Sequence, residues 1–307
     1  MLRQGMLFLS ESSVARAVVT HAPFARTAAR RFVAGETIDE AMAAAKELNA
    51  AGMTITLDYL GESVSDKAEA TQAADTYLEI IDAIVREGID GNVSLKLTQM
   101  GQDIEEVFLG SNVGRVLERA EANEMFVRFD MESSDYTQRT LDFFETLWDA
   151  GTRNCGIVLQ SMLRRTEADT KWANERGVRV RLCKGAYMEP EEVAYPDKKD
   201  VDANFVRCTK LLLDEGTYPG IATHDEAMID ATVEHAKANG IDPSTFEFQM
   251  LYGVRRDIQE QLVNDGWRVR IYVPFGNAWY PYLMRRMAER PANMFFIVGN
   301  VVKEWFR

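Results

Sequence analysis

The 307-residue chain has few of the residues that build disulfide-bonded or metal-binding proteins. Its three cysteines are an odd number and include no Cys-x-x-Cys pair, which argues against a disulfide framework and a structural zinc site. Three histidines are too few for a His-rich metal centre, so we expect no bound metal. No apolar run reaches the roughly 18 residues of a membrane-spanning helix. We therefore expect a cytoplasmic protein.

The chain also lacks the common glycine-rich nucleotide motifs and any basic run. It contains no G-x-G-x-x-G after a strand, no P-loop and no G-x-S-x-G. A nucleotide cofactor must therefore bind by a mode other than that of the doubly wound fold. Lys and Arg total 35 against 48 Asp and Glu, giving a net charge of −13. We expect no nucleic-acid partner, because nucleic-acid binders usually carry the opposite charge.

What the chain does have is a repeated alternation of short apolar runs and helical stretches. The runs are Thr54–Tyr59, Asn92–Leu97, Phe126–Met131, Asn154–Leu159, Val178–Cys183, Ile221–His224, Phe246–Met250 and Val269–Pro274. Eight β–α units predict an α/β fold, a (βα)8 TIM-type barrel with its helices outside. Such barrels place their chemistry at the C-terminal ends of the strands, which is where the polar residues of this chain gather.

The pattern predicts a single domain with a helical lead-in. Residues 1–52 are expected to form an N-terminal helical arm, and residues 53–307 the barrel. Thr37 with Glu40 three residues later has the sequence of a capping box that opens a helix. The stretch 277–307 follows the last strand and reads as one or two helices, the first of which is expected over the C-terminal face of the barrel.

The first 34 residues differ in charge from the rest of the chain. They contain five arginines and one acidic residue, Glu11. One interpretation is an amphipathic helix attracted to anionic lipid, which would give peripheral contact with the inner membrane. The other is an ordinary helical arm packed on the barrel, which we favour on the moderate amphipathicity of the segment.

Three basic residues lie at the ends of predicted strands. Lys96 ends the second run, and Arg181 and Lys184 lie at the end of the fifth. A lysine in an apolar strand is costly unless it is paired or faces a ligand, so convergence of these groups would select an anionic ligand. The alternative is that Lys96 pairs with Asp130 on the neighbouring strand and simply fills the barrel.

Acidic and imidazole side chains occupy comparable positions. Asp130 lies on an otherwise apolar run and is expected to act either as a base or as the partner of a cation. His224 lies at a strand end between Thr223 and Asp225, where contact with a cofactor and a structural role are comparable interpretations.

The predicted final helix carries two adjacent arginines. Arg285 and Arg286 point about 100° apart on a helix, so both reach one small anion when the helix overhangs the barrel mouth. The arginine fork matches the two oxygens of a carboxylate. Tyr282 shares a face with Arg285 at three residues' separation. A surface pair between Arg285 and Glu289 is an equally good interpretation of this pattern.

Taken together, these motifs resemble the proline dehydrogenase family, in its short monofunctional bacterial form and in the corresponding barrel of the bifunctional proline utilisation A protein. The segments that carry the resemblance, in the order of the family, are Leu57–Glu62, Ser94–Thr98, Asp130–Glu132, Val158–Ser161, Arg181–Tyr187, Ala222–Asp225, Phe246–Gln249 and Tyr282-x-x-Arg285-Arg286. Asn277-Ala278 stands where an Arg-Asp pair is expected of close relatives, which puts the geometry of the final loop in doubt.

The resemblance implies that FAD lies across the C-terminal face of the barrel. The residues implied to contact it are Met131, Gln160, Arg181, Lys184, Gly185, Ala186, Thr223, His224 and Leu251. Arg181 is implied to lie beside the reactive edge of the flavin and, with Asp130, to belong to the catalytic machinery.

The resemblance also implies a site for L-proline. Its residues would be Lys96, Arg285, Arg286, Tyr272, Tyr282 and Glu62. The three basic residues would hold the substrate carboxylate, and the two tyrosines would line the substrate ring. Asp130 would support Lys96 and the amine, and Glu62 would pair with Arg285 as a gate.

The reaction implied by the resemblance is oxidation of L-proline to Δ1-pyrroline-5-carboxylate, with hydride passing from proline C5 to flavin N5. Electrons would leave to ubiquinone or menaquinone in the membrane, and pyrroline-5-carboxylate dehydrogenase would be the next enzyme. Two alternatives remain open. One is another barrel enzyme with Lys96 or Lys184 as nucleophile, and the other is a non-catalytic proline sensor.

Overall fold

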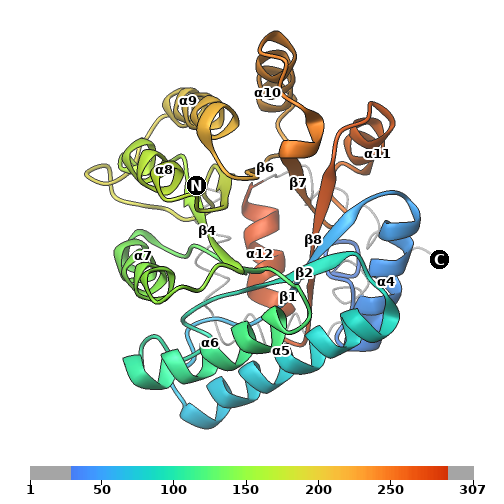
Figure 1. Ribbon diagram of the computed structural model, residues 1–307, viewed down its shortest axis with the longest axis vertical. Helices are drawn as coiled ribbons and strands as arrows, with labels where there is room; N and C mark the ends of the chain where they lie inside the picture. The colour runs from blue at the N-terminus through green and yellow to red at the C-terminus, as the bar shows by residue number, and fades with distance from the viewer. Residues whose placement is uncertain (1–28, 290–307) are drawn as a thin grey trace, which may run out of the picture.

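The computed structural model of the chain describes residues 29–289. Eight parallel strands pair in sequence order and β8 returns to β1, which confirms the predicted closed barrel (Figure 1). The strands are β1 (Thr54–Tyr59), β2 (Gly91–Leu95), β3 (Val127–Phe129), β4 (Cys155–Gln160), β5 (Val180–Cys183), β6 (Gly220–Ala222), β7 (Glu247–Leu251) and β8 (Val269–Phe275).

Several strands end earlier than their apolar runs. Lys96 and Asp130 each follow the last residue of a strand, β2 and β3 respectively. The backbone turns there, because the carbonyl of Lys96 accepts from the Gln99 amide at 3.1 Å and leaves the strand ladder. An apolar run therefore predicted the strand, while the local turn decided where the strand ended.

The helices that connect consecutive strands form the outer ring in Figure 1, with α4 before β1 and α12 after β8. The helices are α4 (Ile38–Ala50), α5 (Lys67–Glu87), α6 (Glu106–Glu121), α7 (Ser134–Asp149), α8 (Thr166–Glu175), α9 (Lys198–Glu215), α10 (Glu226–Ala238), α11 (Arg256–Asn264) and α12 (Trp279–Glu289), with a short 3₁₀ turn at Pro243–Thr245. The sequence pattern predicts helices near 111–124 and 137–150, and the corresponding α6 and α7 begin earlier, at Glu106 and Ser134. Neither start has a capping side-chain hydrogen bond, so the sequence carried no start signal there.

The predicted capping box at Thr37 and Glu40 is present. The Thr37 side chain accepts from the Glu40 amide at 3.3 Å, and the Glu40 carboxylate accepts from the Thr37 amide at 3.3 Å. Ala41 and Ala45 on α4 are buried in the same apolar core as Ile55 of β1. α4 therefore packs on the barrel wall. The division of the chain at residue 52 stays a prediction.

A second, smaller core joins the end of the arm to α12. Its buried members are Ala29, Phe32, Val33, Leu60, Trp279, Tyr280, Tyr282, Leu283 and Met284. The Ala34 amide donates to the Pro274 carbonyl and the Gly276 amide to the Gly35 carbonyl, both at 2.9 Å, so this layer lies beside the C-terminal end of β8. The prediction of a helix over the C-terminal face is confirmed, and α12 crosses the middle of the barrel in Figure 1. Residues 1–28, including Arg3, Arg16 and Arg26, and residues 290–307 lie outside the described part.

The arm passes so close to Gly253 that a side chain there should destabilise the fold. Gly253 has φ of +72°, and a Cβ atom on it would lie 1.6 Å from the Arg31 carbonyl oxygen. We expect Gly253→Ala to lower the free energy of unfolding by about 2–4 kcal/mol, combining left-handed backbone strain with a clash. Gly240→Ala is the control: its φ is +65° and nothing lies within 4 Å. Equal losses for the two variants in thermal unfolding would contradict the close packing of the arm.

Buried polar side chains fill the interior of the barrel. Members of this set are Thr56, Asp58, Asn92, Ser94, Arg128, Asp130, Arg181, Glu247, Gln249 and Arg270. Contacts such as that between Arg181 of β5 and Ser94 of β2 join strands that are not neighbours in the sheet, so they must cross the interior.

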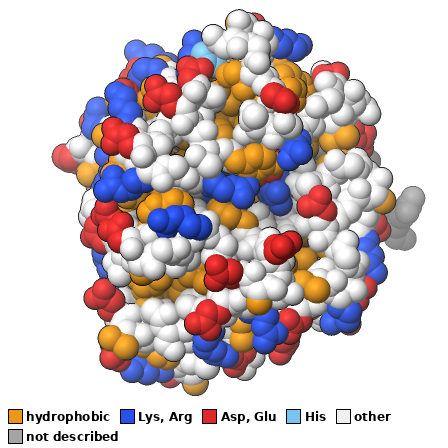
Figure 2. Space-filling view, in the orientation of Figure 1, with side chains coloured by type: hydrophobic (Ala, Val, Ile, Leu, Met, Phe, Trp, Pro, Cys, Tyr) orange, Lys and Arg blue, Asp and Glu red, His pale blue; other side chains and the backbone are white. Residues whose placement is uncertain are grey.

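The surface in Figure 2 is mixed in charge, with basic side chains near the middle of the face shown.

Candidate active site

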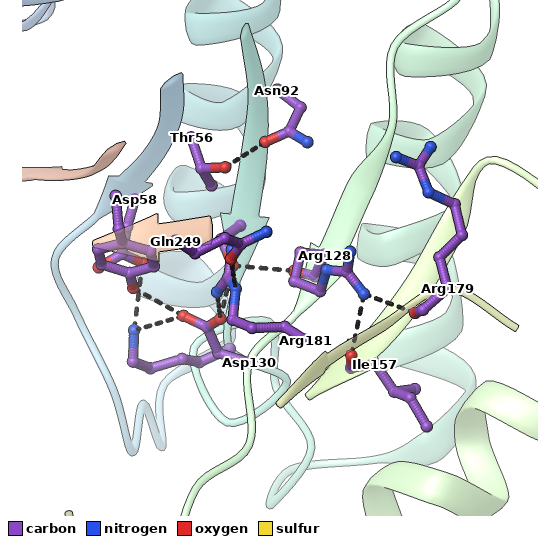
Figure 3. A network of polar contacts seen from close by, with 12 residues as sticks. Thr56, Asp58, Asn92, Arg128, Asp130, Ile157, Arg179, Arg181 and Gln249 are labelled. Atoms are coloured by element: carbon purple, nitrogen blue, oxygen red, sulfur yellow. Dashed lines mark hydrogen bonds and ion pairs between the residues drawn. The ribbon is translucent and has the colours of Figure 1, made fainter. Parts of the chain in front are cut away.

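Asp130 is the centre of a polar network at the C-terminal end of the barrel (Figure 3). Its carboxylate accepts from Arg181 Nη1 at 2.7 Å, from Ser94 Oγ at 2.6 Å and from the Tyr272 hydroxyl at 2.7 Å. These groups come from β5, β2 and β8, so the closed barrel brings together residues that are distant in sequence. The Arg181 guanidinium also lies 5.2 Å from the centre of the Tyr272 ring, within cation–π range.

These contacts decide between the two roles that the sequence left open for Asp130. Burial opposes ionisation, but the charges of Lys96 and Arg181 outweigh it and lower the pKa of Asp130 below its ordinary value. A carboxylate with a lowered pKa and several hydrogen-bond donors is a weak base at neutral pH. The geometry therefore favours Asp130 as an ion partner and positioning group.

Lys96 is paired more closely with Asp58 than with Asp130. Its ammonium lies 3.1 Å from Asp58 Oδ1 and 3.6 Å from Asp130 Oδ2. Burial would lower the pKa of Lys96, but these two carboxylates raise it above its ordinary value, so the ammonium stays charged. Burial and the nearby Asp130 charge raise the pKa of Asp58. The prediction that Lys96 pairs with Asp130 was incomplete, because Asp58 on β1 is the nearer partner.

A cavity of about 330 Å³ opens beside Lys96, between the loop after β1 and α12. Glu62, Lys96, Gln99, Asn277, Ala278 and Pro281 are among its lining residues. Glu62 is close enough to Lys96 to contribute to the raised pKa of the lysine. A cavity with a charged ammonium in its wall suits a small anionic ligand. The Asn277-Ala278 departure lies in this wall, next to the second core.

Of the two adjacent arginines of α12, the structure describes the side chain of Arg286. The Arg286 guanidinium lies 5.1 Å from the Tyr282 ring centre, so this pair shares a helix face. The side chain of Arg285 is outside the described part of the structure. Its pairing with Glu62 stays a prediction.

Gln160 offers a free acceptor at the end of β4. Its amide Nε2 donates to the Glu132 carbonyl at 2.7 Å, while its buried Oε1 has no hydrogen-bond partner among the described residues. Met131 is buried on the neighbouring strand end. Gly185 has φ of +102°, and a Cβ atom there would lie 2.3 Å from Met162 Sδ. The chain thus passes close to its neighbours here, with Ala186 half-buried beside it.

Lys184 is held by two carboxylates. Its ammonium contacts Asp202 at 2.5 Å and Asp225 at 2.7 Å, and Lys198 contacts the same two carboxylates. Nearby, the Leu251 amide donates to His224 Nε2 at 2.8 Å, which places the proton of the neutral imidazole on Nδ1. The structure therefore brings His224 and Leu251 together. Thr223 is buried, and its hydroxyl oxygen accepts from the Asp225 amide at 3.1 Å.

Glu132 gives this end of the barrel a pH-dependent contribution to stability. It is 6 % exposed, and both of its oxygens accept hydrogen bonds from Thr98. Burial raises the pKa of Glu132 to about 7. Because the folded pKa lies above the unfolded one, its contribution is fully present below pH about 4.5 and is lost as the pH rises through about 7.

We expect this loss to be visible in urea unfolding. From pH 5 to pH 8 the free energy of unfolding should fall by about 2–3 kcal/mol more in the wild type than in Glu132→Gln, which cannot ionise. Measurement at both pH values in both proteins isolates the effect from other titrating groups. The same pH slope in both proteins would contradict the raised pKa.

Some residues of the network were not assigned a role from the sequence. Asp58, Ser94, Glu247 and Gln249 all contact a predicted site residue or one of its partners. A signal was present: in Phe246–Gln249 polar residues alternate with phenylalanines, the period of a strand with one polar face. A polar inner face implies that the interior of this barrel is used for hydrogen bonding.

Within residues 29–289 no helix is both long and apolar enough to cross a membrane. In the same range, no group of three or more His, Cys, Asp or Glu side chains is arranged to hold a metal ion.

Comparisons with known proteins agree with this architecture. A family profile described as proline dehydrogenase matches residues 41–298. The chain is 43% identical to the proline dehydrogenase of Deinococcus radiodurans over 279 residues, 90% of each chain. It is 39% identical to proline dehydrogenase 1 of Bacillus subtilis subsp. natto, over 99% of this chain and all of that one.

Among solved structures, proline utilization A from Bdellovibrio bacteriovorus, inactivated by N-propargylglycine, superimposes with a TM-score of 0.81 at 28% identity. The match covers 94% of this chain and 35% of that one, so the chain spans about a third of the larger protein. The family profile and the relatives, each matching most of the chain, agree with the resemblance seen in the sequence motifs. The chain therefore belongs to the proline dehydrogenase family of oxidoreductases.

Proposed function

We propose that the chain catalyses the FAD-dependent oxidation of L-proline to Δ1-pyrroline-5-carboxylate and passes the electrons to ubiquinone or menaquinone. The observation that carries this proposal is the charged Lys96 ammonium in the wall of a cavity at the C-terminal end of the barrel. The chain as a whole has a net charge of −13, and a positive group in a cavity wall would favour a small anion at this place. The carboxylate of proline matches it.

The residues at the barrel mouth fit a flavin. The unsatisfied Oε1 of Gln160 is a buried acceptor suited to a ring N–H, and the Arg181 guanidinium supplies positive charge. The residues proposed to hold FAD are Met131, Gln160, Arg181, Lys184, Gly185, Ala186, Thr223, His224 and Leu251. FAD, when bound, would supply the acceptor for the hydride that leaves C5 of proline.

The substrate would be held through its carboxylate. Lys96, Arg285 and Arg286 are proposed to bind it, and their combined charge would orient the ring of proline. The same positive groups favour loss of a proton from the substrate ammonium, and hydride departure requires this neutral amine. Tyr272 and Tyr282 would line the ring, with Glu62 closing the cavity against Arg285.

The neighbouring pathway steps follow from the product. A pyrroline-5-carboxylate dehydrogenase is the proposed next enzyme, because the product is the substrate of that reaction. A peripheral contact with the inner membrane would bring the quinone within reach, through the arginine-bearing segment before residue 35. That segment lies largely outside the described residues, so the contact rests on its sequence alone.

A lysine nucleophile fits the structure less well. A nucleophilic lysine must be neutral, whereas the Asp58 and Asp130 carboxylates raise the pKa of Lys96. Lys184 is likewise ion-paired to two carboxylates. A lysine nucleophile forms a Schiff base with a carbonyl substrate, so borohydride trapping with α-keto acids and aldehydes would detect one on either lysine, and we expect none.

The test is anaerobic addition of L-proline to the purified protein reconstituted with FAD. We expect the flavin absorbance near its visible maximum to bleach with L-proline and to remain with D-proline. Tetrahydrofuran-2-carboxylate, which keeps the carboxylate and lacks the amine, should inhibit competitively without bleaching. A protein that binds FAD but leaves it oxidised in L-proline would instead be a proline sensor.

A further inference from the structure

Gln249 on β7 is bound from both ends of its side-chain amide. Arg181 Nε donates to Gln249 Oε1 at 2.5 Å, and Gln249 Nε2 donates to Glu247 Oε1 at 2.6 Å (Figure 3 labels Gln249 and Arg181). Arg181 is 6 % exposed and Gln249 is 4 % exposed, so water does not compete for these bonds. The amide therefore has one donor partner and one acceptor partner, on opposite sides.

The Glu247 carboxylate determines the orientation of the Gln249 side-chain amide. Glu247 accepts from Arg270 Nε at 2.7 Å and from the Tyr218 hydroxyl at 3.1 Å. Burial opposes ionisation of Glu247, but Arg270 outweighs it and lowers the pKa of the carboxyl group. An ionised carboxylate accepts hydrogen bonds and donates none. Gln249 must therefore turn its NH₂ group to Glu247, which leaves its oxygen for Arg181.

Arg270, the last side chain in this series of hydrogen bonds, is itself bound to the barrel wall. Arg270 Nη1 donates to the Ile55 carbonyl at 2.7 Å, so the Arg270–Glu247 pair is anchored to β1. With Nε on Gln249 and Nη1 on Asp130, the plane of the Arg181 guanidinium is defined by two bonds. Its Nη2 makes no hydrogen bond within the described part of the chain and is left for a ligand.

We propose that Gln249 is a positioning residue that fixes the Arg181 guanidinium, with Glu247 and Arg270 setting the direction of its amide. Without it, Arg181 keeps only the bonds of its Nη1, to Asp130 and Ser94, and can rotate about this one nitrogen. This inference rests on the proposed flavin site, since Arg181 is useful to a flavin only when its Nη2 keeps one direction.

A glycine on the neighbouring strand makes room for this arrangement. A Cβ atom on Gly220 of β6 would lie 2.3 Å from Gln249 Nε2 and 2.7 Å from its Cδ. Gly220 does not have a positive φ, so alanine there would be strained by the contact rather than by its backbone. Gly220→Ala therefore displaces the amide without removing any polar group.

The experiment compares Gln249→Met and Gly220→Ala with Thr56→Val. Thr56 also makes a buried hydrogen bond inside the barrel, to Asn92 at 2.5 Å, but it has no link to Arg181. FAD affinity is measured by fluorescence titration of each apoprotein, kcat and KM by steady-state assay with L-proline, and stability by thermal unfolding.

We expect both Gln249→Met and Gly220→Ala to weaken FAD binding and to lower kcat, each about tenfold, from loss of one charge-assisted hydrogen bond. KM for proline should stay within about twofold, because the carboxylate-binding residues are untouched. Thr56→Val should lose stability and keep wild-type FAD affinity and kcat. A purely structural Gln249 would instead make all three variants alike.

Wild-type FAD affinity and kcat in both Gln249→Met and Gly220→Ala would overturn the inference while leaving the proposed function intact. Failure of the wild-type apoprotein to bind FAD would overturn the proposed function, and this inference with it. The titration of the wild type therefore separates the two failures.

Discussion

Asp130→Ala is expected to lower the free energy of unfolding by about 3–5 kcal/mol and to abolish proline oxidation. The carboxylate neutralises Arg181 and, in part, Lys96, and it also satisfies the Tyr272 hydroxyl. Removing it leaves two buried cations close together with less compensation, and the cost of such uncompensated charge exceeds that of a lost neutral hydrogen bond. Urea unfolding and the proline-dependent dye-reduction assay measure the two effects.

Asp103→Ala is the matched control. Asp103 also accepts from an arginine and a tyrosine, Arg139 at 2.8 Å and Tyr136 at 2.7 Å, but this pair is at the surface. Its loss should cost less than about 1 kcal/mol, because solvent screens exposed pairs, and activity should be retained. Asp130→Asn keeps the shape without the charge and should fall between Asp130→Ala and wild type. Equal stability losses for Asp130→Ala and Asp103→Ala would contradict the large contribution of the buried Asp130 ion pairs to stability.

Arg286→Ala and Arg285→Ala are each expected to raise KM for proline about 30–100-fold while FAD affinity stays unchanged. The reason is the loss of the charge-assisted contact that we propose to the substrate carboxylate, worth about 2–3 kcal/mol. Lysine at either position keeps the charge but lacks the planar fork, so the lysine variants should recover part of the affinity. Steady-state kinetics over a wide range of proline concentration, with FAD titration in parallel, measures the effect.

Arg256→Ala provides the control for this pair. The Arg256 guanidinium lies 5.7 Å from the Tyr252 ring centre, which is similar to the 5.1 Å between Arg286 and the Tyr282 ring centre. Arg256, however, is exposed on α11. Its removal should leave KM unchanged. If the Arg285 and Arg286 variants used proline normally, the assignment of the carboxylate site to α12 would be wrong, although the flavin site would stand.

The elements of the barrel were largely predictable, and their ends were less so. Apolar runs located all eight strands, since a strand buried between helices and barrel interior needs apolar residues on its outer face. The start of α4 was predictable from Thr37 and Glu40, because a capping box requires particular residue types at a fixed spacing. α6 and α7 begin without such a cap, and their first turns were missed for that reason.

The candidate site divides in the same way. Lys96, Asp130, Arg181 and Tyr272 were all selected from the sequence, and the structure connects them in one network. Asp58 and Gln249 were visible as polar residues at strand ends but received no role. Their partners lie on other strands, and nothing in the spacing of the chain says which polar residues of the barrel interior will meet.

By itself, the sequence determined the alternation of strands and helices, the end of the barrel at which polar groups gather, and the family. These properties follow from local periodicity and short motifs, which each segment carries independently of the others. The tertiary structure alone decided that Lys96 pairs most closely with Asp58, that Asp130 is held as a charged ion partner, and that Gln249 orients Arg181. Closure of the barrel sets these contacts, because strand tilt and register determine which inward-facing side chains lie at the same height along the barrel axis.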